Sequence, residues 1–214
     1  MAIEFQTGAE ETHKIGEGGA AQIRRWLDST YRFKIYQSIY DLDPTGKPYP
    51  KLRVPQLVAS SEGADPEPRY ERFDLIGTVL DENGVSGNTL YVECKKYSQA
   101  GNQGTLYDEY LAVCYSAFVH LSRQVGAPID VEFMWATTHP FSLGNYANLT
   151  TADQIQAACA THPDRLGGDA FDMSIARQLE GRLWLAVVNQ RVDEMIMGLE
   201  LQKVVVARIL ELGR

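Results

Sequence analysis

The chain has 214 residues, is 44% hydrophobic and carries a net charge of −8 at neutral pH. This length and composition predict a single domain, residues 1–214, built around one core. The acidic balance argues against a strongly basic nucleic-acid coat protein. A local basic patch, a metal ion or a partner subunit could still bring nucleic acid to the chain.

No long apolar run of the kind that spans a membrane occurs, and residues 1–14 lack the apolar core of a secretion signal. The three cysteines, Cys94, Cys114 and Cys159, are widely spaced and odd in number. This usage is typical of buried thiols in a reducing compartment, not of a disulfide framework or a zinc site. We therefore expect a cytoplasmic protein that does not bind a membrane.

Residues 14–31 predict a helix that is entered through a glycine turn, because apolar side chains recur there at helical spacing. An alternating first strand is expected over residues 32–42. Residues 43–56 and 60–70 are rich in proline, glycine and charged side chains, which indicates turns or a flexible insertion.

A β-hairpin is predicted next. Residues 71–80 form its first strand, residues 81–88 its turn and residues 89–97 its returning strand. The dipeptide Asn83-Gly84 is the strongest short-range signal for such a turn. We therefore expect the two strands to pair antiparallel.

The second half of the chain alternates between helical and strand patterns. Its expected elements, in order, are a helix over 104–125, a strand over 128–139, helices over 151–162 and 169–181, a strand over 182–189 and an amphipathic helix over 190–212. The whole series favours an α/β fold with a short mixed sheet between helices. Apolar side chains outside the main stripe of the last helix, Met197, Leu201 and Val204, predict a homodimer or a docked partner protein.

Charged side chains interrupt the apolar stretch TLYVECKKYS. Residues two apart on a strand point to the same face, so Glu93 and Lys95 share one face of the sheet and Cys94 lies on the other. Neither charged side chain belongs in a core unless it is paired. Asp74 on the opposing strand should approach Glu93, where two close carboxylates repel and a divalent cation relieves the repulsion.

This arrangement resembles the PD-(D/E)XK nuclease superfamily. Asp74 matches the first acidic position of its motif, and Glu93-Cys94-Lys95 matches the E-x-K tripeptide. Glu17, in the sequence GEGG, matches a glutamate that many members contribute from the first helix. The resemblance implies a restriction-endonuclease-like three-layer fold, with a central mixed β-sheet flanked by helices.

The resemblance covers about residues 10–140, and the strand and helices of residues 150–214 carry no diagnostic motif. The sequence departs from the pattern at Phe73, where the motif has a proline before the aspartate. Because that proline is often missing in the superfamily, the departure weakens the resemblance only slightly.

The resemblance also implies a chemistry. Asp74 and Glu93 would hold Mg²⁺, or Mn²⁺ in its place, together with the backbone carbonyl of Cys94 and with Glu17 through water. The metal would activate a water molecule and neutralise charge on the phosphate. Lys95 would orient or deprotonate the attacking water, or stabilise the charge of the transition state.

Three residues near the tripeptide are candidates for substrate contact: Lys96, Gln103 and Tyr107. Tyr110 is a further candidate, although tyrosines on a helix more often pack with the hydroxyl reaching water. The alternative for Asp74, Glu93 and Lys95 is a cross-strand ion pair on a solvated sheet face. Glu17 could equally serve the dipole of its helix from the first turn.

The expected function is therefore a Mg²⁺-dependent endonuclease that hydrolyses phosphodiester bonds. DNA is the expected polymer because most members of the superfamily act on it, and an effector of anti-phage defence or restriction is the expected setting. A catalytically silent or scaffolding domain of the same fold, acting in a larger complex, is the first alternative. A small-molecule phosphoesterase or other metal hydrolase is the second.

Overall fold

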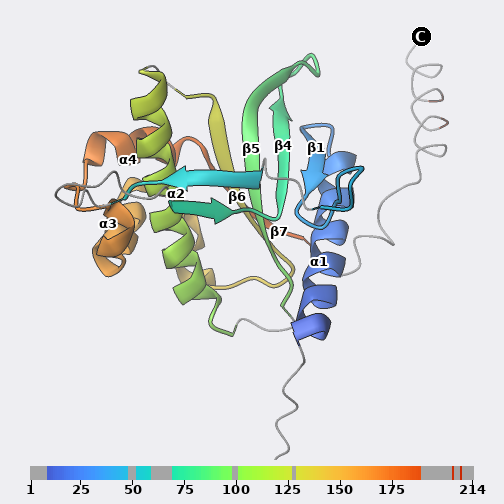
Figure 1. The fold of residues 1–214 in the computed structure, drawn as a ribbon, viewed down its shortest axis with the longest axis horizontal. Helices are drawn as coiled ribbons and strands as arrows, with labels where there is room; N and C mark the ends of the chain where they lie inside the picture. Colours follow the sequence, from blue (N-terminus) through green and yellow to red (C-terminus); the bar gives the residue numbers. More distant parts are fainter. Residues whose placement is uncertain are drawn as a thin grey trace, which may run out of the picture.

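A five-stranded mixed sheet lies at the centre of the molecule, between helices that cover both of its faces (Figure 1). We describe it from a computed structural model. The described residues are 9–47, 52–58, 69–97, 101–126, 129–188, 204 and 208. This architecture confirms the α/β fold that the alternation of elements predicts.

The strand order in the sheet is β1-β4-β5-β6-β7, in which β1, β4 and β5 are antiparallel neighbours and β5, β6 and β7 run parallel. The strands are β1 Phe33–Ser38, β4 Leu75–Leu80, β5 Ser86–Lys95, β6 Val131–Thr137 and β7 Leu183–Val187. The helices are α1 Ala9–Ser29, α2 Gln103–Val125, α3 Ala152–Thr161 and α4 Met173–Glu180. Two 3₁₀ turns, η2 Leu143–Asn148 and η3 Pro163–Leu166, connect the later elements.

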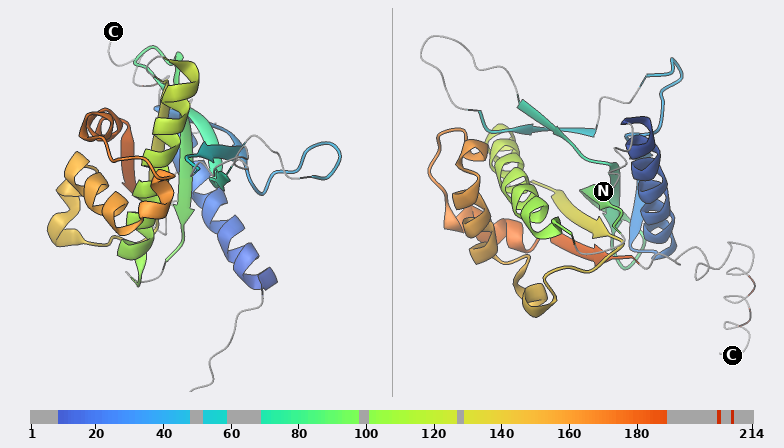
Figure 2. Two further views of the ribbon diagram at one scale, coloured as in Figure 1. Left: turned by 60° about the vertical axis from the view of Figure 1, so that its left-hand side comes forward. Right: turned by 90° about the horizontal axis from the view of Figure 1, so that it is seen from below.

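Each face of the sheet has its own apolar core, because successive side chains of a strand point to opposite faces. On β5, Leu90 and Val92 point toward α1 and pack on Ile23 and its neighbours. Tyr91 points the other way, toward α2, where Phe133 and other aromatic side chains gather. Figure 2 shows α1 and α2 on opposite faces, with α3 and α4 outside α2.

The predicted hairpin is confirmed. β4 and β5 pair antiparallel, and Gly84 of the turn has a positive φ of +73°, a conformation that glycine adopts without strain. The register places Leu75 opposite Val92. Asp74, one residue before β4, therefore lies beside the end of β5, as the sequence pattern predicts.

The predicted glycine turn before the first helix is wrong, because α1 continues through all three glycines of GEGG. Their lack of a side chain lets other segments approach the helix. A Cβ atom on Gly19 would lie only 2.9 Å from the Cβ of Lys96, and one on Gly16 only 2.5 Å from the hydroxyl of Tyr40. Glu17 consequently lies well inside the helix and not in its first turn.

A separate two-stranded ribbon, which the sequence pattern does not predict, lies beside the central sheet. β2 Arg53–Gln56 lies where a turn was expected, and it pairs antiparallel with β3 Arg69–Arg72, which spans the end of the second expected turn and the start of the strand expected over 71–80. The strand expected over 71–80 is therefore broken at Phe73 and Asp74, where the chain passes from the ribbon into the central sheet. The ribbon crosses α2 (Figures 1 and 2).

The amphipathic helix expected over 190–212, and with it the dimer or partner contact, lies outside the described residues apart from positions 204 and 208. Val204 is 64% exposed. Among the described helices, none is long and apolar enough to cross a membrane.

Candidate active site

Glu93 and Lys95 lie at the end of β5 and share one face of the sheet. The Lys95 Nζ lies 2.7 Å from the Glu93 Oε1, and the two side chains are 27% and 21% exposed. Both line a pocket of about 150 Å³ between the sheet, α2 and the ribbon. An ion pair on an open solvated face would be more exposed, so the partial burial favours a built site.

Asp74 approaches the same strand end from β4. Its Oδ2 accepts a hydrogen bond of 2.7 Å from the backbone N–H of Cys94. This bond fixes the carboxylate beside the strand that carries Glu93 and Lys95. The side chain of Cys94 packs with the α1 core, and burial, followed by the charges of Asp74 and Glu93, raises the pKa of its thiol well above the ordinary value.

The two carboxylates hold protons more tightly than isolated ones. Burial raises the pKa of Glu93 to about 7, with a further contribution from Asp74 and partial compensation by Lys95. Burial also raises the pKa of Asp74, against the opposing effects of the Cys94 N–H and Lys95. Two crowded carboxylates in a poorly solvated position favour a bound cation or a bound proton.

Lys95 remains charged at neutral pH. Burial acts to lower its pKa, but Glu93, through its charge and its hydrogen bond, together with Asp74 and Tyr97, outweighs burial and raises the pKa overall. Its ammonium group also lies 5.4 Å from the centroid of the Trp135 ring, where the negative face of the ring attracts a cation. A charged Lys95 suits stabilisation of an anion better than proton abstraction.

Glu17 projects from α1 and is exposed. It lies near the site, because Glu17, Asp74 and Glu93 all contribute, after burial, to raising the pKa of Tyr40 to about 12. Within the described part of the chain, no three acidic, histidine or cysteine side chains converge on one potential metal position. Asp74 and Glu93 would thus leave positions for the Cys94 carbonyl and water, in keeping with the preference of Mg²⁺ for water ligands.

Two substrate candidates are corrected by the structure. Gln103 and Tyr107 are buried at 0% and 1% exposure, so neither side chain can reach a substrate on the surface. The Gln103 amide bonds the Thr137 hydroxyl at 2.7 Å, and the Tyr107 hydroxyl donates to the Leu149 carbonyl at 3.0 Å. Both side chains instead tie α2 to the end of β6 and to the segment that follows it.

The other two substrate candidates, Lys96 and Tyr110, lie on opposite sides of the sheet. Lys96 is exposed, but its side chain lies against Gly18 and Gly19 of α1, away from the pocket that Lys95 lines. Tyr110 does line that pocket, although it is largely buried. Alternation along β5 explains the placement of Lys96, since it shares a face with Cys94.

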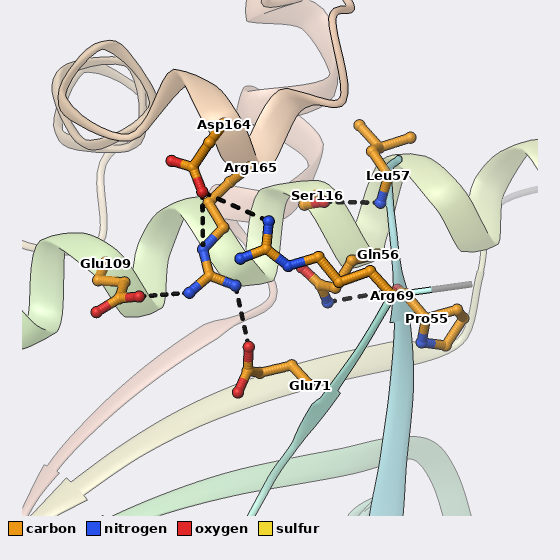
Figure 3. Close-up of polar contacts among 9 residues, drawn as sticks. All are labelled: Pro55, Gln56, Leu57, Arg69, Glu71, Glu109, Ser116, Asp164 and Arg165. Atoms are coloured by element: carbon orange, nitrogen blue, oxygen red, sulfur yellow. Dashed lines mark hydrogen bonds and ion pairs between the residues drawn. The ribbon is translucent and has the colours of Figure 1, made fainter. Parts of the chain in front are cut away.

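Arg165 is a further residue that lines this pocket. Its guanidinium is 10% exposed and binds the carboxylates of Glu71 on β3, at 3.0 Å, and Glu109 on α2 (Figure 3). Asp164 lies between Arg165 and Arg69. This clasp, which joins η3, α2 and the ribbon, depends on side chains 94 and 56 positions apart, so no local pattern could have revealed it.

The ribbon is further anchored by the backbone N–H of Leu57, which donates to the Ser116 hydroxyl of α2 at 2.9 Å (Figure 3). The inner face of the ribbon is therefore held on α2 next to Glu93 and Lys95.

Comparison of the chain with protein-family models, with curated proteins and with solved structures finds no match.

Proposed function

We propose that the protein is a metal-dependent nuclease that hydrolyses phosphodiester bonds, with DNA as its substrate. The observation that carries the proposal is the convergence of Asp74, Glu93 and Lys95 at the adjoining ends of β4 and β5. Two carboxylates with raised pKa values suit a divalent cation, and a charged lysine beside them suits a phosphate.

The order of the elements supports the same proposal. A helix, three antiparallel strands, a helix and a strand parallel to the third strand form the core, in the order α1, β1, β4, β5, α2 and β6. Asp74 immediately precedes the second strand of this sheet, and Glu93 lies on the third. A restriction-endonuclease-like fold is part of the proposal, and the ribbon is an addition between its first two strands.

The residues have distinct roles in this reading. Asp74 and Glu93 would hold the cation, which lowers the pKa of a bound water and neutralises phosphate charge. The Cys94 N–H holds Asp74 in place, and Glu93 holds Lys95 beside the pocket. Lys95 donates hydrogen bonds to the phosphate oxygens and stabilises the negative charge that grows in the transition state.

A screen of polymers and metals tests this function. Purified protein is incubated with supercoiled, linear and single-stranded DNA, with RNA and with a small-molecule phosphodiester, each with Mg²⁺, Mn²⁺ or EDTA. We expect metal-dependent cleavage of DNA that is lost in Lys95→Ala. Equal cleavage by Lys95→Ala would point to a contaminant, and hydrolysis of the simple ester alone would point to a small-molecule phosphoesterase.

A lack of cleavage in every condition, also in the presence of proteins that copurify, would favour the silent scaffold. The same protein samples should then be checked for metal binding, because a scaffold has no need to retain a functional cation site.

A further inference from the structure

The outer face of the β2–β3 ribbon carries two arginines directly opposite each other. Arg53 on β2 pairs in register with Arg72 on β3, and both are exposed. Like charges at directly opposed positions of a strand pair destabilise it. Within the described residues, neither guanidinium forms an ion pair.

The charged side chains on the inner face of the ribbon, in contrast, form ion pairs. Alternation places Arg69 and Glu71 on that face, and each is neutralised by an ion pair, with Asp164 and Arg165 respectively (Figure 3). The chain as a whole is acidic, with a net charge of −8. Uncompensated positive charge concentrated on one face of one small element therefore calls for an anionic ligand.

The position of the ribbon identifies the kind of ligand. Arg72 lines the same pocket as Glu93 and Lys95, so the arginine pair lies directly beside the candidate active site. Tyr70, on the same outer face, is 50% exposed and offers a ring on which a sugar or base could rest. Guanidinium groups bind phosphates through paired hydrogen bonds.

We infer that Arg53 and Arg72 form a binding site for the phosphate backbone of DNA, which guides the strand across the ribbon to the Glu93–Lys95 pocket. This inference rests on the proposed nuclease function and names its substrate-binding surface. The phosphates bridge the two guanidinium groups and remove their mutual repulsion. Contacts of this kind position the polymer and do not read its sequence.

Binding of fluorescein-labelled DNA, measured by anisotropy in EDTA over a range of salt concentrations, tests the inference without cleavage. The double variant Arg53→Gln/Arg72→Gln should bind more weakly, and its negative slope of log affinity against log salt should become shallower by about two. Between 50 and 200 mM salt, wild type should then lose about tenfold more affinity than this variant. The control Lys34→Gln/Arg177→Gln removes the same charge from exposed positions on β1 and α4 and should leave the slope nearly unchanged.

A single variant separates binding from folding. Arg53→Glu replaces a like-charge pair with an opposite-charge pair, so it should raise the melting temperature while it weakens DNA binding. A merely structural role for Arg53 would move both measurements in the same direction, and that result would overturn the inference. Equal effects of the ribbon and control variants, no DNA binding by wild type, or binding confined to RNA would overturn it too.

The combined binding and cleavage results test the nuclease proposal separately from the binding site. Ribbon-dependent DNA binding without cleavage by wild type would reject the proposed hydrolysis but retain the binding site. Cleavage by wild type with an unchanged KM in the ribbon variant would reject the binding site but retain the nuclease.

Discussion

Lys95 and Glu93 form an ion pair of 2.7 Å on the face of β5 that points toward α2, and the Trp135 ring lies beside the ammonium group. The pair is only partly exposed, and Asp74 approaches it from the adjoining strand. A partly buried pair that lines a pocket is positioned for a ligand that can contact both charges.

Removal of either member of the pair should abolish DNA cleavage without unfolding the protein. Lys95→Ala and Glu93→Gln should each lower kcat by about a hundredfold or more, because each loses a contact made in the transition state. Asp74→Asn should behave alike, and Glu17→Gln should be milder if its contact passes through water. Initial cleavage rates, together with circular dichroism to confirm folding, provide the measurement.

The neighbouring lysine provides a matched control. Lys96 lies against Gly18 and Gly19 on the opposite side of the sheet, so Lys96→Ala should retain most of the activity. A loss as large as that of Lys95→Ala would show that general positive charge near the strand end, and not the position of Lys95, supports cleavage.

The raised pKa of Glu93 predicts that this residue destabilises the fold as the solution becomes neutral. Burial first, and Asp74 second, raise the pKa from the ordinary 4.5 to about 7. The folded state thus binds the proton more tightly than the unfolded chain, so its contribution to stability is complete below pH 4.5 and is lost as the pH rises through 7. The raised pKa of Asp74 acts in the same direction.

Urea unfolding of wild type and Glu93→Gln between pH 5 and pH 8 measures this contribution. The free energy of unfolding of wild type should fall relative to the variant by about 1–3 kcal/mol across that range, since glutamine does not titrate. A difference between the two proteins that does not change with pH would contradict the raised pKa.

Mg²⁺ or Mn²⁺ should stabilise the protein if Asp74 and Glu93 share a cation. At a metal concentration about ten times the Kd, the gain is about 1.4 kcal/mol, which corresponds to a rise in Tm of roughly 3–5 °C for a chain of this size. The rise should be larger at pH 8 than at pH 5, because a protonated Glu93 cannot act as a ligand. Thermal unfolding of Asp74→Asn under the same conditions should show no such rise, and an equal rise would place the metal elsewhere.

Two adjacent glycines of α1 should respond oppositely to alanine. Glycine inside a helix normally costs about 0.5–1 kcal/mol relative to alanine, and a Cβ on Gly18 would meet nothing closer than the Lys96 Nζ at 3.9 Å. Gly18→Ala should therefore raise the free energy of unfolding. A Cβ on Gly19 would lie 2.9 Å from the Lys96 Cβ, near the backbone of β5, so Gly19→Ala should lower it. Denaturant unfolding of both variants measures these changes. Equal gains in the free energy of unfolding would contradict the close packing of Lys96 on Gly19.

The Arg165 clasp should contribute more to the free energy of unfolding than an exposed ion pair does. Arg165→Met leaves Glu71 and Glu109 without their shared partner, and because both carboxylates are partly exposed the expected loss is about 1–3 kcal/mol of unfolding free energy. Arg123→Met breaks the more exposed pair with Asp169 and should cost less than about 1 kcal/mol. Chemical unfolding that shows similar losses for both would contradict the clasp.

The amino-acid sequence by itself determined the features that follow short-range rules. Asn83-Gly84 predicts the hairpin because glycine adopts the positive φ of the turn without strain, and the period of two places Glu93 and Lys95 on one face. The register of that hairpin then carries Asp74 to the same strand end. These steps need only the geometry of a strand and the chemistry of a turn, so the positions of the candidate acidic residues were predictable.

Only the tertiary structure decided which side chains meet across the fold. The glycines of α1 read as a turn in the sequence, yet they remain helical because β5 and Tyr40 pack closely against them. Gln103 is buried by its bond to Thr137, and Arg165 meets Glu71 from a distant turn. These outcomes depend on how separate elements approach one another, since burial and pairing of a polar side chain are set by partners that no local spacing reveals.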